Sequence, residues 1–204
     1  MATLTVKERI LRLATHRFAE LGFQATTMRS IAARAGVTLP TIYHYFGDKE
    51  RLYLEVCIAT FAPRAERAIE DQTKSAASNE RKILHFFVGL CTELLENENF
   101  FKLLHREMID QDDEGIRLLT ERCWTAAFTT LASAFGALVG SEGSPIDTTF
   151  AAMALMLGLV EFRRKAPYLH KSLSRLYDPL TLAVFVLNTT LPAVNWAGVV
   201  DQAA

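Results

Sequence analysis

Apolar residues recur at steps of three and four positions along most of the chain, and no segment alternates apolar and polar residues with the period of a β-strand. This pattern predicts an all-α protein with about nine helices. The first helix is predicted from Val6 to Leu21, because one apolar stripe runs along it and Gly22 follows as a stop. The stripe consists of Ile10, Ala14, Phe18 and Leu21.

Two short helices joined by a tight turn are predicted between residues 26 and 46. Thr26 can cap the first of them, and Gly36 follows its last apolar residue. Thr38 can cap the second, which should begin near Leu39, since a proline such as Pro40 is tolerated in the first helical turn. With the helix before them, they have the layout of a helix-turn-helix head, whose last helix enters the DNA major groove.

The last of these helices, residues 39 to 46, has two chemically different faces on a helical wheel. One arc holds Ile42, Tyr45 and Phe46, and we expect it to be buried. The other arc offers hydroxyl, imidazole and phenol groups for hydrogen bonds, and apolar groups that suit a thymine methyl. Its members are Leu39, Pro40, Thr41, Tyr43 and His44. The alternative interpretation places Tyr43 in the core with the other aromatic residues.

Several short motifs occur together at fixed offsets in this part of the chain. They are Ala19 to Gly22 (AELG), Thr26-Thr27, Ile31-Ala32, Ala35-Gly36-Val37, the run from Thr41 to Phe46, and Lys49-Glu50. Through these motifs the chain resembles the TetR family of transcriptional regulators over residues 5 to 56. The resemblance implies an all-helical homodimer that represses or activates transcription from palindromic double-stranded DNA, with an effector pocket in its C-terminal part.

The resemblance also implies roles for single residues. Thr27 and Lys49 correspond to phosphate contacts, and Tyr43 corresponds to a phosphate or base contact. The base-facing positions are Arg29, Leu39, Thr41 and His44, and Thr38 and Pro40 complete the predicted DNA-binding set. Arg29 has the alternative role of a solvated helix residue. Leu39 replaces a polar residue that many members carry, and Arg51 stands where Glu is common, so the operator sequence does not follow from the resemblance.

Charge is unevenly distributed along the chain. Residues 1 to 52 contain eight Lys or Arg and four Asp or Glu, a net +4, and the whole chain carries −1, so the remainder carries −5. A basic head on an otherwise acidic chain fits a protein that contacts DNA at one end only. We therefore predict a DNA-binding domain over residues 1–50 and a helical effector-binding and dimerisation domain over residues 51–204.

The helical pattern continues to the end of the chain. A fourth helix is predicted from its cap Asp48 toward Asp71, with a kink or interruption at Pro63. The further predicted helices are Asn79 (as cap) to Asn97, Glu98 to Asp110, Ile116 to Val139, Asp147 (as cap) to Lys165, and one that opens at Asp178-Pro179. Residues 111–115, 141–145 and 166–177 are predicted connectors.

The last two long helices are apolar around much of their circumference, which a helix with a single packing partner does not need. We predict that they pack against the same helices of a second subunit in a two-fold, four-helix interface. The predicted interface residues are Met153, Leu157, Val160, Val184, Leu187 and Leu191. The alternative is a wholly intramolecular core. The apolar run from Phe150 to Val160 is too short to span a bilayer and indicates a buried helix.

The helices between residues 79 and 139 carry more bulky apolar side chains than their own packing requires. Such surface, with few polar groups, is typical of a small-molecule cavity. The predicted ligand-binding residues are Phe86, Leu90, Phe101, Leu104, His105, Met108, Trp124 and Phe128. The effector should accordingly be a small apolar or aromatic molecule. The alternative is that these side chains fill the core, and that His105, like His85, is a structural histidine.

Other functions lack a matching pattern. The acidic run from Asp110 to Glu114 lacks the spacing of a calcium loop, the histidines and cysteines lack metal-ligand spacing, and no Ser or Cys lies in a nucleophile motif. We expect no metal, no cofactor and no enzymatic activity. Buried free thiols are expected at Cys57, Cys91 and Cys123. The N-terminus lacks a signal pattern, which favours a cytoplasmic protein without a membrane partner. Two rival functions are an architectural or non-specific DNA-binding protein without an effector, and a small helical enzyme.

Overall fold

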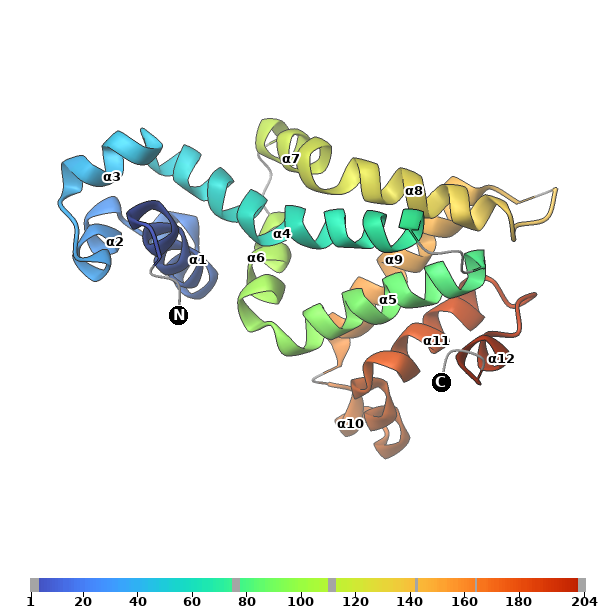
Figure 1. Cartoon of the computed structure of the whole chain (residues 1–204). Coiled ribbons are helices and arrows are strands. Elements are labelled where there is room, and N and C mark those ends of the chain that lie inside the picture. Colours follow the sequence, from blue (N-terminus) through green and yellow to red (C-terminus); the bar gives the residue numbers. More distant parts are fainter. Residues whose placement is uncertain (1–3, 75–77, 110–112, 142, 164, 202–204) are drawn as a thin grey trace. The chain divides into compact units, whose positions relative to one another are not determined.

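The computed structural model describes residues 4–74, 78–109, 113–141, 143–163 and 165–201, and over these residues the protein is all-helical (Figure 1). The described chain contains twelve α-helices, one π-helical turn and one 3-10 helix, which confirms the all-α prediction. The chain divides into two compact units, and each is described by itself. Unit 1 comprises residues 1–65 and 98–125, and unit 2 comprises residues 66–97 and 126–204. The domain boundary at residue 50 stays a prediction.

Three helices at the start of unit 1 form the head. They are α1 (Val6–Ala25), α2 (Met28–Ala35) and α3 (Leu39–Phe46), and α2 packs against both of the others. Burial of apolar side chains from all three helices holds the head together. These side chains are Ile10, Ala14, Phe18, Met28, Ile31, Ile42 and Phe46. The predicted helix-turn-helix is confirmed, with Gly36 in the left-handed conformation (φ 61°, ψ 38°) at the end of α2.

α1 bends at Gly22, where the sequence predicted a stop. Gly22 has φ 77° and ψ 174°, a combination open essentially to glycine alone, and the chain then completes another turn to Ala25. Thr26, which we predicted as the cap of α2, is buried, and its hydroxyl donates to the Gly22 carbonyl oxygen at 2.8 Å. The cap is Thr27, whose hydroxyl oxygen accepts the Ser30 N–H at 3.2 Å.

The remaining helices of unit 1 follow the head. α4 (Lys49–Lys74), whose residues beyond Ala65 belong to unit 2, begins where Asp48 accepts the Arg51 N–H at 2.7 Å. It runs through Pro63 without an interruption, and the alternative that we gave, a kink, stays a prediction. α6 (Glu98–Ile109) packs against α1. The single helix predicted from Ile116 to Val139 is divided into three parts. They are α7 (Asp113–Leu119), the π-helical turn η1 (Thr120–Trp124) and α8 (Thr125–Gly136), most of which belongs to unit 2.

Unit 2 is centred on α11 (Pro179–Thr190), which packs against α5 (Asn79–Glu96) and α9 (Pro145–Phe162). α12 (Trp196–Asp201), which the sequence analysis did not predict, packs on α5 and α11. Its Trp196 is fully buried and donates from Nε1 to the Leu191 carbonyl oxygen at 3.1 Å. The predicted connector over 166–177 is largely helical, with α10 (Ala166–Leu169) and the 3-10 helix η2 (Lys171–Tyr177).

Side-chain caps begin three helices of unit 2. Ser78 rather than Asn79 caps α5, and Ser144 rather than Asp147 caps α9, each by accepting the backbone N–H three residues on. Both serines directly precede the first helical residue, which is where the cap geometry requires the hydroxyl. Asp178 caps α11 as predicted, because its carboxylate accepts the Thr181 N–H at 2.7 Å.

Candidate DNA-binding surface

α3 has one buried face and one exposed face. Ile42 and Phe46 lie in the core of the head, with 0% and 5% of their surface exposed. Tyr43 is 48% exposed on the other side of the helix. Tyr45, which we expected in the core, is 43% exposed, so that prediction was wrong. The accessible face of α3 is therefore wider than the helical wheel indicated.

The first turn of α3 is held by a threonine pair. The hydroxyl groups of Thr38 and Thr41 hydrogen-bond to each other at 2.8 Å, and Thr38 makes no capping bond to the backbone. Pro40 is exposed in the first turn, where its missing N–H removes no intrahelical hydrogen bond. Leu39 is half-buried. This turn therefore offers both hydroxyl and apolar atoms at the surface.

Lys49 lies at the start of α4, close to the end of α1. Its Nζ donates to the Phe23 carbonyl oxygen at 3.2 Å and lies 4.1 Å from the centroid of the Phe23 ring. An ammonium has three N–H donors, so this contact orients the side chain and leaves donors for a phosphate oxygen. Thr27 and Arg29, at the start of α2, are both exposed.

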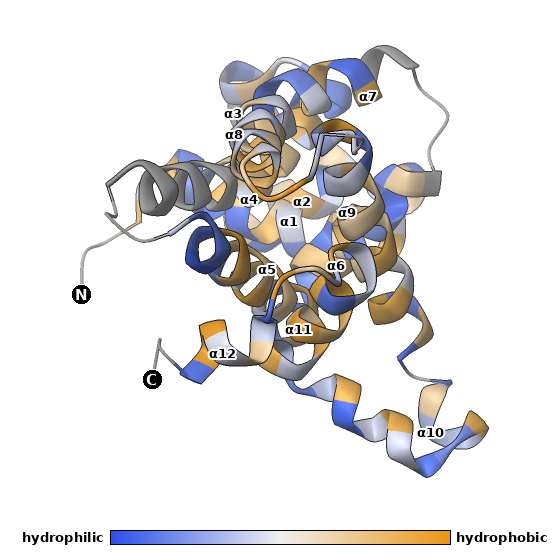
Figure 2. Cartoon of the chain, turned by 90° about the vertical axis from the view of Figure 1, so that its right-hand side faces the viewer, coloured by the Kyte–Doolittle hydropathy of each residue, from blue (hydrophilic) through white to orange (hydrophobic). Residues whose placement is uncertain are grey.

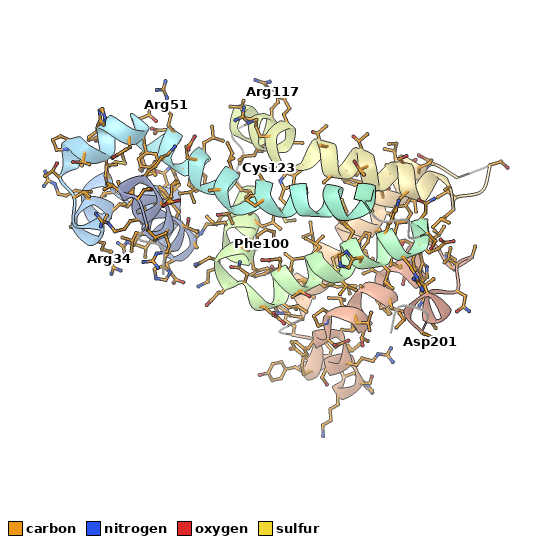
Figure 3. The ribbon with its side chains drawn as sticks, in the orientation of Figure 1. Arg34, Arg51, Phe100, Arg117, Cys123 and Asp201 are labelled. Atoms are coloured by element: carbon orange, nitrogen blue, oxygen red, sulfur yellow. The ribbon has the colours of Figure 1, made fainter. Side chains whose placement is uncertain are left out.

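Further cations lie on the surface of the head. Arg34 at the end of α2 and Arg51 in α4 are exposed, and their side chains extend away from the helices (Figure 3). Arg51 lies 3.6 Å from Asp48 in an exposed ion pair, which contributes little to stability in water. Exposed cations of this kind raise the local concentration of a polyanion such as DNA.

α6 contacts the bend of α1 through charged side chains, a contact that the sequence analysis did not identify. Arg106 donates from Nε to the Ala19 carbonyl oxygen at 3.3 Å and from Nη2 to the Glu20 carbonyl oxygen at 3.2 Å. These carbonyl groups precede the bend at Gly22. Lys102 forms an ion pair of 2.5 Å with Glu20, and hydrogen bonding to this ammonium lowers the pKa of the Glu20 carboxyl group. The bend is therefore stabilised from outside the head.

α6 also contacts α4 through a partly buried polar cluster. The Tyr53 hydroxyl donates to the Glu107 carboxylate, and Cys57 Sγ lies 3.8 Å from the same carboxylate oxygen. Burial is the largest cause that raises the pKa of both Tyr53 and Cys57 above their ordinary values. Both groups therefore stay neutral at physiological pH and act as hydrogen-bond donors.

The predicted ligand-binding residues are divided between the two units. Phe101, Leu104, His105, Met108 and Trp124 belong to unit 1, and Phe86, Leu90 and Phe128 belong to unit 2. Within unit 1, the rings of Phe101 and His105 stack at 6.2 Å between centroids. The ring centroid of Phe61 lies 5.5 Å from that of Trp124 and 5.3 Å from that of Phe100. Within unit 2, Phe86 contacts Phe87 at 5.5 Å. The role of this set as a ligand site stays a prediction.

The predicted dimer residues differ in burial. Val160, Leu187 and Leu191 are buried within unit 2, and Met153, Leu157 and Val184 are half-buried. α9 and α11 do expose large apolar side chains, but these belong to residues outside the predicted interface set. They are Ile146, Phe150 and Phe162 on α9 and Leu180 and Phe185 on α11.

α9 is buried on one face only, although the sequence indicated a buried helix. Its buried residues are Thr149, Ala152, Met156 and Val160. The hydropathy colouring shows apolar residues along the helix (Figure 2). Among the described residues it is the one helix that is long and apolar enough to cross a membrane by length and composition, with a mean hydropathy of 1.4. A helix of this composition also suits an interface between protein subunits.

The three cysteines are buried and free, as predicted. Burial raises the pKa of Cys91 to about 12. In the part of the chain that the structure describes, no group of three or more His, Cys, Asp or Glu side chains is placed to hold a metal ion. Asp110 and Asp112 of the acidic run lie outside the described residues.

Comparison with known proteins gives matches over the head and beyond it. Residues 10–56 match the family described as bacterial regulatory proteins, tetR family. The chain is 42% identical over 112 residues to the HTH-type transcriptional repressor KstR2 of Mycolicibacterium smegmatis, a match that covers 55% of this chain and 51% of KstR2. It is 26% identical over 151 residues to the uncharacterized HTH-type transcriptional regulator YerO of Bacillus subtilis, covering 74% of this chain and 51% of YerO. The chain therefore spans about half the length of both relatives, which are regulators rather than enzymes.

A solved structure extends the likeness of the fold to nearly the whole chain. The transcriptional regulator FadR from Bacillus subtilis, determined in complex with stearoyl-CoA, superposes with a TM-score of 0.75 over 92% of this chain and 98% of FadR, at 19% identity. This likeness shows a shared fold. Together with the helix-turn-helix geometry, the match over residues 10–56 identifies the head of the chain as that of the TetR family of bacterial regulatory proteins.

Proposed function

We propose that the protein is a dimeric repressor that binds a palindromic operator and is released from it by a small, largely apolar ligand. The DNA-binding part rests on one observation. Tyr43 and His44 are exposed on α3 opposite Ile42 and Phe46, which are buried in the head. A helix that is anchored along one face and open along the other can lie in the major groove.

The proposed contacts divide into two kinds. Thr27, Tyr43 and Lys49 contact phosphates and set the position of the head on the duplex. The base-reading contacts are assigned to Arg29, Leu39, Thr41 and His44, with Thr38 and Pro40 at the edge of the same surface. A threonine hydroxyl and an imidazole can each bond to base edges, and Leu39 and Pro40 suit a thymine methyl.

A second copy is required because an operator with two half-sites needs two heads. The half-sites lie about 34–36 Å apart, or a multiple of that distance, so the subunits must hold the heads at a fixed separation. The apolar side chains that α9 and α11 expose support a two-fold interface between these helices. Since Val160, Leu187 and Leu191 are already buried within one subunit, we centre the proposed interface on Phe150 and Phe185.

The effector is proposed to contact the apolar and aromatic side chains that the sequence predicts as its ligand-binding set. FadR was determined with stearoyl-CoA, so long-chain acyl-CoA molecules are the first compounds to test. Release requires that the ligand prefer the conformation with low DNA affinity. A change from 1:99 to 99:1 between two conformations needs about 5.5 kcal/mol of differential binding. A regulator of this kind acts on chromosomal DNA and therefore in the cytoplasm.

The DNA-binding proposal is tested by selecting bound sequences from random DNA and measuring variants by gel shift. Tyr43→Ala and Lys49→Ala should weaken binding to every sequence, and Lys49→Ala should lower the salt slope by about one. Thr41→Ala and His44→Ala should change which bases are preferred, by about 1–3 kcal/mol per base pair. Arg117→Ala, which removes an exposed ion pair between Arg117 of α7 and Glu121 of η1, is the control. Unchanged affinity and preference in all four variants would exclude this surface.

The effector proposal needs a separate measurement. Stearoyl-CoA, and the free CoA as a control for its polar part, are titrated against the preformed complex with the selected operator. Release by the acyl-CoA alone supports an apolar effector of this class. If no sequence is enriched and no apolar compound raises the unfolding temperature, the protein is an architectural DNA-binding protein instead.

A further inference from the structure

The segment between α9 and α11, residues 166–177, projects from unit 2. We name this segment the arm; it contains α10 and η2 and extends away from α5 in both views (Figures 1 and 2). In α10, Tyr168 is 91% exposed and Leu169 is 72% exposed. Contact of large apolar side chains with water is unfavourable. We therefore expect another surface to cover Tyr168 and Leu169.

The base of the arm is fixed, which distinguishes it from a loose loop. The Tyr177 hydroxyl donates to the Arg163 carbonyl oxygen at 2.6 Å, and this bond joins the end of η2 to the end of α9. His170 caps η2 through its Nδ1, which accepts the Ser172 N–H at 3.3 Å. η2 also packs against α11. The end of the arm is therefore attached to both α9 and α11.

We propose that the arm reaches onto a second copy of this chain and forms part of the dimer interface through Tyr168 and Leu169. This inference rests on the dimer proposed above, and it adds an element outside the α9 and α11 helices. The arm begins four residues after the last residue of α9 and ends two residues before the first of α11, so its surface continues theirs.

The exposed apolar area supports this assignment. With roughly 200 Å² for each whole side chain, the exposed parts of the large apolar residues on α9 and α11 amount to about 500 Å². The arm adds roughly 400 Å² through Tyr168, Leu169 and Tyr177. The sum is comparable with the roughly 800 Å² that one partner buries in an interface of standard size. The helices alone fall short of that value.

Charge is compatible with a second copy of this chain as the partner of the arm. The arm contains Lys171 and Arg175 and no acidic residue, so it carries +2. Unit 2 as a whole has nine Lys or Arg and eleven Asp or Glu, a net −2, so the unit without its arm is at −4. The arm of one copy and the rest of unit 2 of another therefore carry opposite net charge.

The test measures self-association by sedimentation equilibrium. Tyr168→Ser/Leu169→Ser should raise the dimer dissociation constant at least tenfold, because two exposed apolar side chains lose their cover. Ile116→Ser, which alters a 39% exposed residue of α7 in unit 1, is the control and should leave the constant unchanged. Circular dichroism of the arm variant verifies that its helices remain.

A second measurement reads the contact directly. With p-benzoylphenylalanine in place of Tyr168, irradiation should give a covalent dimer, whereas the same group in place of Ile116 should not. A dissociation constant equal to that of the natural chain and the absence of a covalent dimer would overturn the arm contact while the α9 and α11 dimer stands. A natural chain that is monomeric at all concentrations would overturn the proposed dimer itself. Crosslinking to phosphatidylglycerol vesicles in place of protein would assign the arm to a membrane and also overturn the inference.

Discussion

Replacing Gly22 by alanine should destabilise unit 1 more than any other single glycine-to-alanine change in the head. Gly22 is the only residue of α1 outside the helical conformation, at φ 77° and ψ 174°. The bend directs the last turn of α1 toward Thr26, whose hydroxyl bonds back to the Gly22 carbonyl oxygen. The guanidinium group of Arg106, from α6, lies close to Gly22 at this bend.

Two effects add at this position. An alanine held in this backbone conformation costs about 1–3 kcal/mol. A Cβ on Gly22 would lie 2.8 Å from Nη1 of Arg106, so the guanidinium must move. Moving it weakens two long hydrogen bonds from a charged donor to the Ala19 and Glu20 carbonyl oxygens, for which we take about 2 kcal/mol together. The total is about 4 kcal/mol, which corresponds to a fall in unfolding temperature of about 8–16 °C for a chain of this size.

The measurement is thermal unfolding followed by circular dichroism, with Gly36→Ala as the matched control. Gly36 also has a positive φ, but its conformation is the ordinary left-handed one and no atom lies within 4 Å of an added Cβ. Its replacement should cost about 1 kcal/mol. In Gly22→Ala/Arg106→Met the steric conflict is absent, so the double variant should be more stable than the sum of the single effects predicts. Equal shifts for the two glycine variants, or strict additivity in the double variant, would refute this reasoning.

Two further predictions concern titratable groups. The Thr181 N–H and hydroxyl lower the pKa of Asp178 below its ordinary value of 3.8, so its capping contribution is present above that pH and is lost as the pH falls through the lowered pKa. The stability difference between the natural chain and Asp178→Asn should therefore shrink in acid, and a difference that is independent of pH would contradict the assignment. The buried thiols of Cys57, Cys91 and Cys123, with raised pKa values, should not react with a thiol reagent at pH 8 until the chain is unfolded.

The periodicity of the sequence was sufficient for the type of most elements and for the helix-turn-helix, but not for two details of α3 and its neighbours. Thr26 and Thr27 are adjacent, and either can cap a helix. The choice depends on the bend at Gly22, which brings a carbonyl oxygen within reach of the Thr26 hydroxyl. Tyr45 lies on the same arc as Ile42, but a three-helix head is too small to cover the whole arc, and the ring stays exposed.

The apolar spacing of the sequence did not reveal the π-helical turn η1 either. Ile116, Leu119, Cys123 and Ala127 follow one another at steps of three and four, as in an uninterrupted helix. A π turn inserts one residue without changing this apolar spacing enough to be noticed. Contacts between distant segments, such as Arg106 with the end of α1, carry no local signal at all. The face of α3 follows from one helix and its pattern, whereas the support behind it depends on tertiary packing.

The contacts of α6 add a second helix to those that hold the head in position within unit 1. α4 follows the head directly in the chain, but it is not the one helix in unit 1 that contacts the head. In unit 1, α6 is joined to α1 through Arg106 and Lys102, and to α4 through the bond between Glu107 and Tyr53. Three charged residues of α6, Lys102, Arg106 and Glu107, thus bind two different helices of unit 1. A displacement of α6 must therefore either carry α1 and α4 with it or break charged hydrogen bonds, and both outcomes alter the support on which α3 lies.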